Sequence, residues 1–206
     1  MSQATTFLGP AMTRVLPRQG AARWLAQIGL LALAVALMTL AAKTKVQIGP
    51  VPITLQTLVL PLIAATYGSR LGAVAMLAYL AAGFAGAPVF TNTPPAVPGP
   101  AYFLGPTGGY LLMYPLAAFV IGWVGERKAG RNLAVLFAAM LAGDALIFAG
   151  GVLWLAFFAI LSSGAPGMGL AKAWTVGAAP FLLADLLKQA LAACLVVGTG
   201  WISRKS

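Results

Sequence analysis

The sequence predicts an all-α integral membrane protein, a single domain built as a bundle of six transmembrane helices. Of the 206 residues, 61% are hydrophobic and 8% are charged, whereas a soluble domain carries about 25% charged residues. The mean hydropathy is +0.93, and the apolar residues fall into six segments divided by charged or turn-forming stretches. Such a chain has too few polar residues to cover a globule, so we expect lipid to cover it.

Each predicted span is an apolar run that approaches or exceeds the roughly 20 helical residues needed to cross about 30 Å of hydrocarbon. The six runs are residues 24–42, 53–67, 71–88, 107–124, 132–161 and 180–201. The second is short unless the loop before it enters the membrane. The fifth is long, which predicts a helix that is tilted, or broken near Gly150 and Gly151. The sixth begins at Pro180, because proline is favoured at the first helical position.

The stretches around these runs predict loops and a tail. Residues 91–100 contain four prolines, and residues 162–169 are rich in glycine, so both are predicted loops. The first run of about 19 apolar residues exceeds the 7–15 of a signal-peptide core, which favours a retained helix. Residues 1–21 are therefore predicted to form a cytoplasmic N-terminal tail, and residues 22–206 the transmembrane domain.

The basic residues predict the orientation of the chain. Six spans place both termini on one side, and positive residues collect in cytoplasmic loops. The segments on the side of the termini hold nine lysines and arginines against three on the other side, which predicts that both termini are cytoplasmic. The net charge of +10 does not indicate nucleic-acid binding, because the basic residues are scattered singly and form no stripe. The three basic residues on the side away from the termini are Lys43, Lys45 and Lys172.

The residue types that most enzymes need are scarce in this chain. It has three acidic residues, one cysteine and no histidine, which leaves little for acid–base, triad or metal chemistry. A Walker A motif is also missing, because the glycine-rich residues 164–169 continue with Leu-Ala-Lys. We therefore expect no enzyme activity, no ATP hydrolysis, no metal and no cofactor.

Asp185 and Lys188 are the charges that hydrocarbon tolerates least. They lie three residues apart in the sixth span, hence on one face of its helix. Charges inside a span are costly unless they pair or face a polar cavity, so the pair is a candidate site about 8 Å from the outer end of the helix. A purely structural ion pair is the alternative. Asp144, near the middle of the fifth span, fits either a protonated carboxyl bonded to a backbone carbonyl or a role in transport.

Three turn sequences on the same predicted side as this pair supply residues that shape a cavity. Each alone is an ordinary turn of a membrane protein, but non-helical backbone at membrane depth is tolerated mainly where it lines a cavity. Their convergence favours a small-solute binder or transporter over a membrane enzyme or a purely structural bundle. The sequences are VPITLQT (51–57), GAPVFTN (86–92) and GPTGGY (105–110).

Four longer strings resemble the BioY family, the biotin-capturing S components of energy-coupling-factor vitamin transporters. They are KVQIGPVPITLQTLVLPLIAATYGSRLGA, YLAAGFAGAPVF, GPTGGYLLMYPLAAFVIGWVGE and GAAPFLLADLLKQALA. The resemblance extends from about residue 22 to the C-terminus and implies a six-helix bundle in a prokaryotic inner membrane that binds biotin from outside. It also implies partners, namely a transmembrane coupling subunit and two ATPase subunits. An S component for another small vitamin-like solute is the alternative.

The resemblance also implies binding residues. The family's acid–lysine pair matches Asp185 and Lys188, and a carboxylate beside an ammonium offers an acceptor and a donor to a ureido group. The other matches are Thr54 and Gln56 in the loop after the first span and Asn92 in a later outer loop. Aromatic candidates to enclose the biotin ring are Phe90, Phe103 and Tyr110.

Two further positions follow from the same resemblance. Some relatives carry an arginine just before GPTGGY, where this chain reads AYFL over residues 101–104, so the resemblance supplies no cation for the biotin carboxylate. In the first span, Ala32 and Ala36 have the small-xxx-small spacing that lets helices approach closely in lipid. The resemblance implies that they form the surface for the coupling subunit.

Overall fold

The computed structural model describes residues 20–47, 49–96, 98–127, 132–161 and 164–202, and most of them are helical. Its six longest helices correspond in order to the six predicted spans. All the elements are α1 (Ala21–Lys43), β1 (Lys45–Val46), β2 (Ile53–Thr54), α2 (Gln56–Tyr67), α3 (Ser69–Phe84), α4 (Pro100–Phe103), α5 (Gly108–Gly125), α6 (Leu133–Phe157), α7 (Leu170–Gly177) and α8 (Leu182–Ile202).

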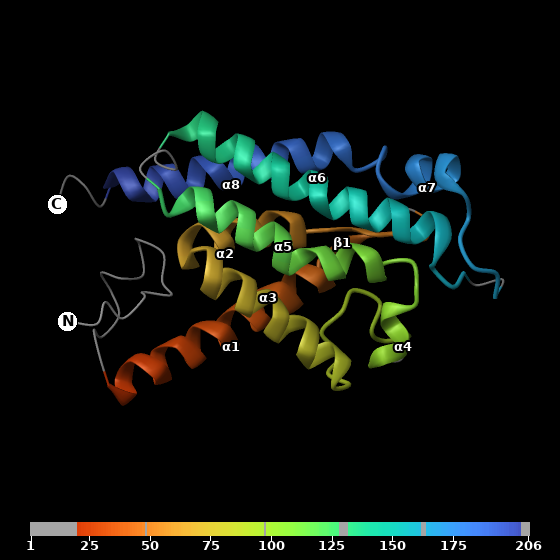
Figure 1. Cartoon of the computed structure of the whole chain (residues 1–206), viewed down its shortest axis with the longest axis horizontal. Helices are drawn as coiled ribbons and strands as arrows, with labels where there is room; N and C mark the ends of the chain where they lie inside the picture. The colour runs from red at the N-terminus through yellow and green to blue at the C-terminus, as the bar shows by residue number, and fades with distance from the viewer. Residues whose placement is uncertain (1–19, 48, 97, 128–131, 162–163, 203–206) are drawn as a thin grey trace.

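Helix α5 is the centre of the arrangement, because α2, α3 and α6 all pack against it. Helices α6 and α8 run side by side along one side of the bundle, and α1 lies on the other side beyond α3 (Figure 1). The beginning of α1 and the end of α8 lie at the same end of the molecule (Figure 1). Large apolar side chains point outward, including Leu183 (71% exposed) and Trp24 (69%), as expected for a surface covered by lipid.

The helix lengths agree in part with six crossings. Helices α1, α5 and α6 are each long and apolar enough to span a membrane, and α7 and α8 meet the same test as a pair bent by 51°. Helices α2 and α3, with 12 and 16 residues, are shorter than that test requires. The bundle therefore has several membrane-spanning helices and two shorter apolar ones.

The predicted break in the fifth span is wrong, because α6 runs unbroken through Gly150 and Gly151. A Cβ atom at Gly150 would overlap Met113, and one at Gly151 would overlap the ring of Tyr110, both on α5. The two glycines therefore serve close packing between α6 and α5 and cause no kink. Packing against a neighbouring helix outweighs the low helix propensity of glycine here.

The start of the sixth span also differs from its prediction. The helix begins at Leu182, two residues after Pro180, and a separate short helix, α7, precedes it. Pro180 lies in the turn between the two helices. Because α7 has eight residues and includes Lys172 and Thr175, its segment is too short and too polar to resemble a span.

A small hairpin forms the two-stranded sheet of this otherwise mostly helical structure. Strands β1 and β2 pair antiparallel, with Lys45 opposite Thr54 and Val46 opposite Ile53. The backbone N–H of Leu55 then donates to Ala41 O at 3.2 Å, which ties the start of α2 back to the end of α1. The hairpin thus returns the chain from α1 to the position where α2 begins.

Helix α1 is only half engaged with the bundle. Its buried residues are Ala34, Met38, Ala41 and Ala42, all in its C-terminal half. The N-terminal half diverges from the other helices in Figure 1, and Ala32 and Ala36 are exposed.

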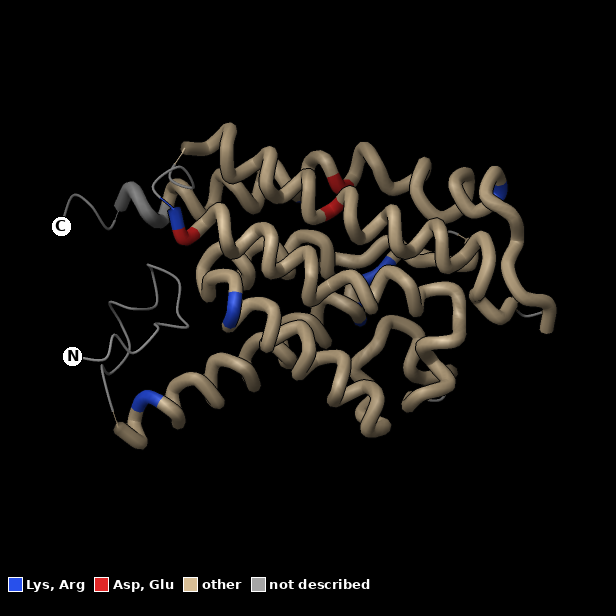
Figure 2. The backbone as a smooth tube through the Cα atoms, viewed as in Figure 1, with Lys and Arg blue, Asp and Glu red and all other residues tan. Residues whose placement is uncertain are grey.

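Acidic residues occupy two kinds of place in the bundle (Figure 2). At the end where α1 begins, Glu126 accepts hydrogen bonds from the backbone N–H of Ser69 (2.8 Å) and from its hydroxyl (3.1 Å), which caps the N-terminus of α3. The other acidic residues, Asp144 of α6 and Asp185 of α8, lie in the middle of the bundle, where these two helices run side by side (Figure 2).

Gly122 is a position where the bundle has no room for a larger residue. A Cβ atom there would lie 2.5 Å from Gly68 C and Ser69 N, which are backbone atoms that cannot rotate away. We expect Gly122→Ala to lower the stability by about 1–3 kcal/mol, the usual cost of overpacking. The measurement is the thermal unfolding midpoint of detergent-solubilised protein. Gly29→Ala is the matched control, because a Cβ at Gly29 meets nothing within 4 Å, and its midpoint should not fall.

Candidate functional site

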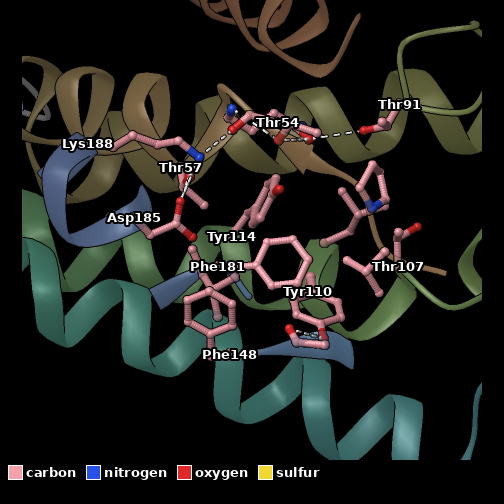
Figure 3. A pocket seen from close by; sticks show the side chains of 16 residues that line it. Thr54, Thr57, Thr91, Thr107, Tyr110, Tyr114, Phe148, Phe181, Asp185 and Lys188 are labelled. Atoms are coloured by element: carbon pink, nitrogen blue, oxygen red, sulfur yellow. Dashed lines mark hydrogen bonds and ion pairs between the residues drawn. The ribbon is translucent and has the colours of Figure 1, made fainter. Parts of the chain in front are cut away.

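A pocket with about 550 Å³ of space, part of it open to solvent, lies between α2, α5, α6 and α8 (Figure 3). Thr57, Tyr110 and Asp185 line it from the first turns of α2, α5 and α8. The pocket therefore lies toward the end of the bundle at which these three helices begin, away from the beginning of α1.

An ion pair forms the charged corner of the pocket. Lys188 Nζ lies 2.6 Å from Asp185 Oδ1, one helical turn away on α8. Lys188 Nζ also donates to Thr54 O at 2.7 Å and to Thr57 Oγ1 at 3.2 Å. An ammonium has three N–H donors, so each proton of Lys188 has one acceptor. Such a fully bonded arrangement offsets the cost of placing the charge among apolar helices.

Asp185 keeps one oxygen available for a ligand. Its Oδ1 atom accepts from Lys188 and, at 2.8 Å, from the hydroxyl of Thr57. The other oxygen, Oδ2, accepts no hydrogen bond among the described residues. Because Asp185 is only 2% exposed and lines the pocket, we infer that this free acceptor serves the pocket and not bulk solvent. The position of Asp185 in the first turn of α8 also favours a negative charge.

Gln56 holds the next part of the polar wall together. Its Nε2 atom donates to Tyr79 Oη at 3.0 Å, and its Oε1 atom accepts from the hydroxyls of Thr54 and Thr91, each at 3.3 Å. Gln56 is 3% exposed. Its bonds connect β2, α3 and the turn at residues 90–93, so its main effect is to fix the shape of the wall.

Aromatic side chains form the opposite wall (Figure 3). The hydroxyl of Tyr110 donates to Gly177 O at 2.8 Å, which joins α5 to α7. Phe148 meets the Tyr110 ring edge-on at 6.4 Å between centroids, and Phe181 lies 6.1 Å from Phe148. Together with Tyr114, these rings offer an apolar surface facing the ion pair, which suits a ligand with one polar and one apolar face.

The structure brings together five of the eight predicted binding residues. Thr54, Gln56, Tyr110, Asp185 and Lys188 all line the pocket. They come from four different elements and are up to 134 positions apart in the sequence. A direct hydrogen bond from Lys188 to Thr54 joins the first and the last of them.

The other three predicted residues lie outside the pocket lining. Phe90 is fully buried, stacked on Tyr102 at 4.7 Å and edge-on to Phe103 at 5.3 Å. A Cβ at Gly83 would overlap the Phe90 ring, so this glycine makes the space that Phe90 fills. Phe90 and Phe103 therefore support the loop that follows α3, and they do not contact the 550 Å³ space.

Asn92 and two lysines belong to this loop as well. Asn92 Oδ1 accepts from Lys45 Nζ at 2.6 Å and faces a neighbouring surface pocket that shares Thr107 with the main one. Lys45 also donates to Thr91 O at 2.9 Å, and Lys43 donates to Phe90 O at 2.7 Å. The two lysines thus fasten the turn at residues 90–93 onto the end of α1 and the hairpin.

Four further pocket residues are absent from the predicted binding set, although helical spacing could have found three of them and the fourth ends the VPITLQT stretch. Tyr114 lies four residues after Tyr110, Phe148 four after Asp144, and Phe181 four before Asp185. Residues four apart in a helix share a face, so each lies beside a residue already singled out. The fourth is Thr57, whose hydroxyl contacts both charges.

Thr57 offers a test of the ion pair that needs no ligand. Thr57→Val keeps the shape of the side chain but removes the donor to Asp185 and the acceptor for Lys188. We expect stability to fall by about 1–3 kcal/mol, the cost of leaving buried polar groups unsatisfied, measured as the thermal midpoint in detergent. Thr57→Ser should restore most of it, and Thr175→Val is a control because Thr175 is exposed and bonds only to Lys172 O. Equal midpoints for Thr57→Val and the wild type would contradict this account of the pair.

Fold and site together define a class of protein. Several apolar helices surround a pocket with an ion pair and an aromatic wall, and no group of three or more metal-ligating side chains occurs among the described residues. This is the architecture of a multi-pass membrane protein that binds a small solute.

The chain belongs to the BioY family, whose sequence profile matches residues 12–204, and the family predicted from the four sequence strings is confirmed. It is 36% identical to the probable biotin transporter BioY of Pyrococcus horikoshii over 81% of this chain and 91% of that protein. It is also 36% identical to the biotin transporter BioY of Thermotoga maritima, over 79% and 88%.

A solved structure shares the fold. The chain superposes with a TM-score of 0.73 and 25% sequence identity on the crystal structure of the S-component for biotin from an ECF-type ABC transporter. The superposition covers 91% of this chain and 95% of that chain. The shared fold therefore extends over most of both chains.

Proposed function

We propose that this protein is a biotin-binding S component, a transporter subunit and not an enzyme, that captures biotin from outside the cell. Its membership of the BioY family and the biotin transporters among its relatives support this function. The observation that carries the proposal is the ion pair of Asp185 and Lys188, which is held in a pocket between membrane-spanning helices and keeps one carboxylate oxygen free.

The chemistry of biotin matches the two walls of the pocket. Its ureido group has two N–H donors and one carbonyl acceptor, and its bicyclic ring is apolar. In our proposal, Asp185 Oδ2 accepts a ureido N–H. Lys188 turns one proton from Thr57, its longest hydrogen bond at 3.2 Å, to the ureido carbonyl. The ring then lies against Tyr110 and Phe148, where burial of apolar surface supplies most of the affinity.

The remaining predicted residues take supporting roles in this proposal. Thr54 and Gln56 hold the polar wall in place through their hydrogen bonds. Asn92 faces the neighbouring pocket that shares Thr107 with the main one, so it lies on a path for the carboxylate tail of biotin. Phe90 and Phe103 support the loop that carries Asn92.

The same proposal includes the topology and the partners. Six crossings with both termini in the cytoplasm place the pocket in the outer half of a prokaryotic inner membrane. Arg23 and Arg70 are in the first turns of α1 and α3, at the end where α1 begins, which favours a cytoplasmic location for that end. The proposed cytoplasmic tail, residues 1–21, lies almost wholly outside the described residues. The proposed partners are a transmembrane coupling subunit and two ATPase subunits.

Binding of radiolabelled biotin to the purified protein tests the function directly. We expect Asp185→Asn and Lys188→Ala to raise the dissociation constant at least about tenfold, because 1.4 kcal/mol is tenfold in affinity and each change leaves a buried charge and a ligand group unpaired. Lys172→Ala is the control, since Lys172 lies on α7 outside the pocket lining, and it should bind like the wild type. A size-exclusion profile for each variant reports folding.

The outcomes separate a binding role from a structural one. If the ion pair only locked the helices together, the two variants would be recovered poorly but would bind with near-normal affinity. Well-folded variants with unchanged affinity would exclude Asp185 and Lys188 from the site. A wild-type protein that binds no biotin would overturn the proposed ligand.

The exposed face of α1 provides a test of the proposed coupling surface. Ala32→Trp or Ala36→Trp should impair biotin uptake and co-purification with a coupling subunit while biotin binding persists, because bulk at small-residue positions keeps helices apart in lipid. Leu153→Trp is the control, since Leu153 is 51% exposed on α6, on the other side of the bundle. If Ala32→Trp and Ala36→Trp lose biotin binding to the same extent as they lose uptake, this part of α1 shapes the pocket.

A further inference from the structure

Tyr79 on α3 lies directly behind the polar wall of the pocket. It belongs neither to the predicted binding residues nor to the residues that line the pocket. Its side chain is fully buried, and its hydroxyl has two partners: it accepts a hydrogen bond from Gln56 Nε2 at 3.0 Å and donates one to Val89 O at 3.0 Å. Tyr79 therefore joins Gln56, a residue of the pocket lining, to the backbone of the loop that follows α3.

The backbone carbonyl of Val89 decides the direction of these two bonds. A carbonyl oxygen can only accept, and a tyrosine hydroxyl has a single proton. No described residue other than Tyr79 donates to Val89 O, and a buried carbonyl without a donor is costly. The Tyr79 proton is therefore committed to Val89 O, so Gln56 must turn its NH2 group, and not its carbonyl oxygen, toward the Tyr79 oxygen.

The orientation of Gln56 then fixes the protons of two threonines. Because Nε2 faces Tyr79, Oε1 faces the hydroxyls of Thr54 and Thr91 and accepts from both, each at 3.3 Å. These two bonds use both lone pairs of the amide oxygen. If the amide were rotated by 180°, its NH2 group would donate to the two hydroxyl oxygens, and the threonine protons would be free to donate to a ligand.

The threonines of the polar wall, Thr54, Thr57 and Thr91, all use their hydroxyl protons within the wall (Figure 3). The first and the third donate to the amide, and Thr57 donates to Asp185. The ammonium of Lys188 is the donor among these groups, and its neighbours Asp185 and Thr54 present oxygen acceptors. This wall therefore suits a ligand that presents N–H or O–H donors together with one acceptor.

We propose that Tyr79 is a positioning residue that sets the specificity of the pocket. Through Gln56 it keeps the protons of Thr54 and Thr91 away from the ligand. The wall then accepts hydrogen bonds from N–H or O–H groups of a ligand and disfavours ligand acceptors except at Lys188. The two ureido N–H groups of biotin meet this requirement. That choice of ligand rests on the proposed function, whereas the hydrogen-bonded link between Tyr79 and Gln56 does not.

A double-mutant cycle without biotin tests the link between Tyr79 and Gln56. Tyr79→Phe removes the hydroxyl but keeps the ring, which meets Phe90 edge-on at 5.4 Å between centroids, and Gln56→Met removes the amide at similar length. We expect each change to lower the thermal unfolding midpoint in detergent. The double variant should lose less than the sum, because both changes break the same hydrogen bond. Additive losses would overturn the link.

Tyr67→Phe is the matched control for this cycle. Tyr67 is another buried tyrosine, and its hydroxyl donates to Leu30 O at 3.1 Å, at the opposite end of α2 from Gln56. Its effect on the midpoint should add to that of Gln56→Met, and its affinity for biotin should equal that of the wild type. The control thereby separates a loss of stability from a loss of binding.

Biotin titration tests the positioning role. Tyr79→Phe should raise the dissociation constant about three- to tenfold, because the freed amide of Gln56 can rotate and turn threonine protons toward the ligand. In the Gln56→Met background, the same change should raise it less than about twofold. Equal weakening in both backgrounds, or an unchanged affinity in Tyr79→Phe, would overturn the role.

Two biotin analogues test the specificity, each a cyclic carbamate in which one ureido N–H is replaced by a ring oxygen. The wild type should bind both at least about tenfold more weakly than biotin, because an acceptor replaces a donor. For at least one of them, Tyr79→Phe should narrow this preference about threefold or more, since a released threonine proton can donate to the ring oxygen. An unchanged preference for both would overturn the specificity role. A wild type that binds no biotin would overturn the proposed ligand, while the midpoint cycle still decides the link between Tyr79 and Gln56.

Discussion

The ammonium group of Lys188 is the constraint on which the rest of this structure depends. A charge among apolar helices is tolerated when every donor finds an acceptor, and the three acceptors here come from Thr54, Thr57 and Asp185. These residues belong to β2, α2 and α8. The hairpin must therefore return the chain to the point where α2 begins, and α2 must pack beside α8. The three residues that accept these hydrogen bonds also form the polar wall of the pocket.

Close packing around α5 supplies the other wall. Gly151 on α6 leaves room for the Tyr110 ring, and Gly177, the last residue of α7, leaves room for its hydroxyl. The aromatic residues of α5 and α6 and Phe181, just before α8, can therefore gather on one side of the pocket. Helices in lipid associate through close contact, so small residues at the helix interfaces stabilise this bundle as burial of apolar surface stabilises a soluble protein.

The lysines near the pocket have two different roles. Lys43 and Lys45 bond to the turn at residues 90–93. These bonds provide donors for backbone carbonyl groups of a turn that lies outside the helices. Lys188 is thus the one cation that lines the pocket among the described residues.

The sequence alone determined what depends on composition and on spacing within one segment. These properties are the apolar helices, the family, and the shared face of Asp185 and Lys188, because the geometry of a helix fixes which neighbours share a face. Tertiary structure decided which segments meet. It kept α6 unbroken at Gly150, placed Phe90 in a supporting cluster, and brought Thr57 against both charges. Such contacts depend on packing between distant parts of the chain, and no local pattern in the sequence records them.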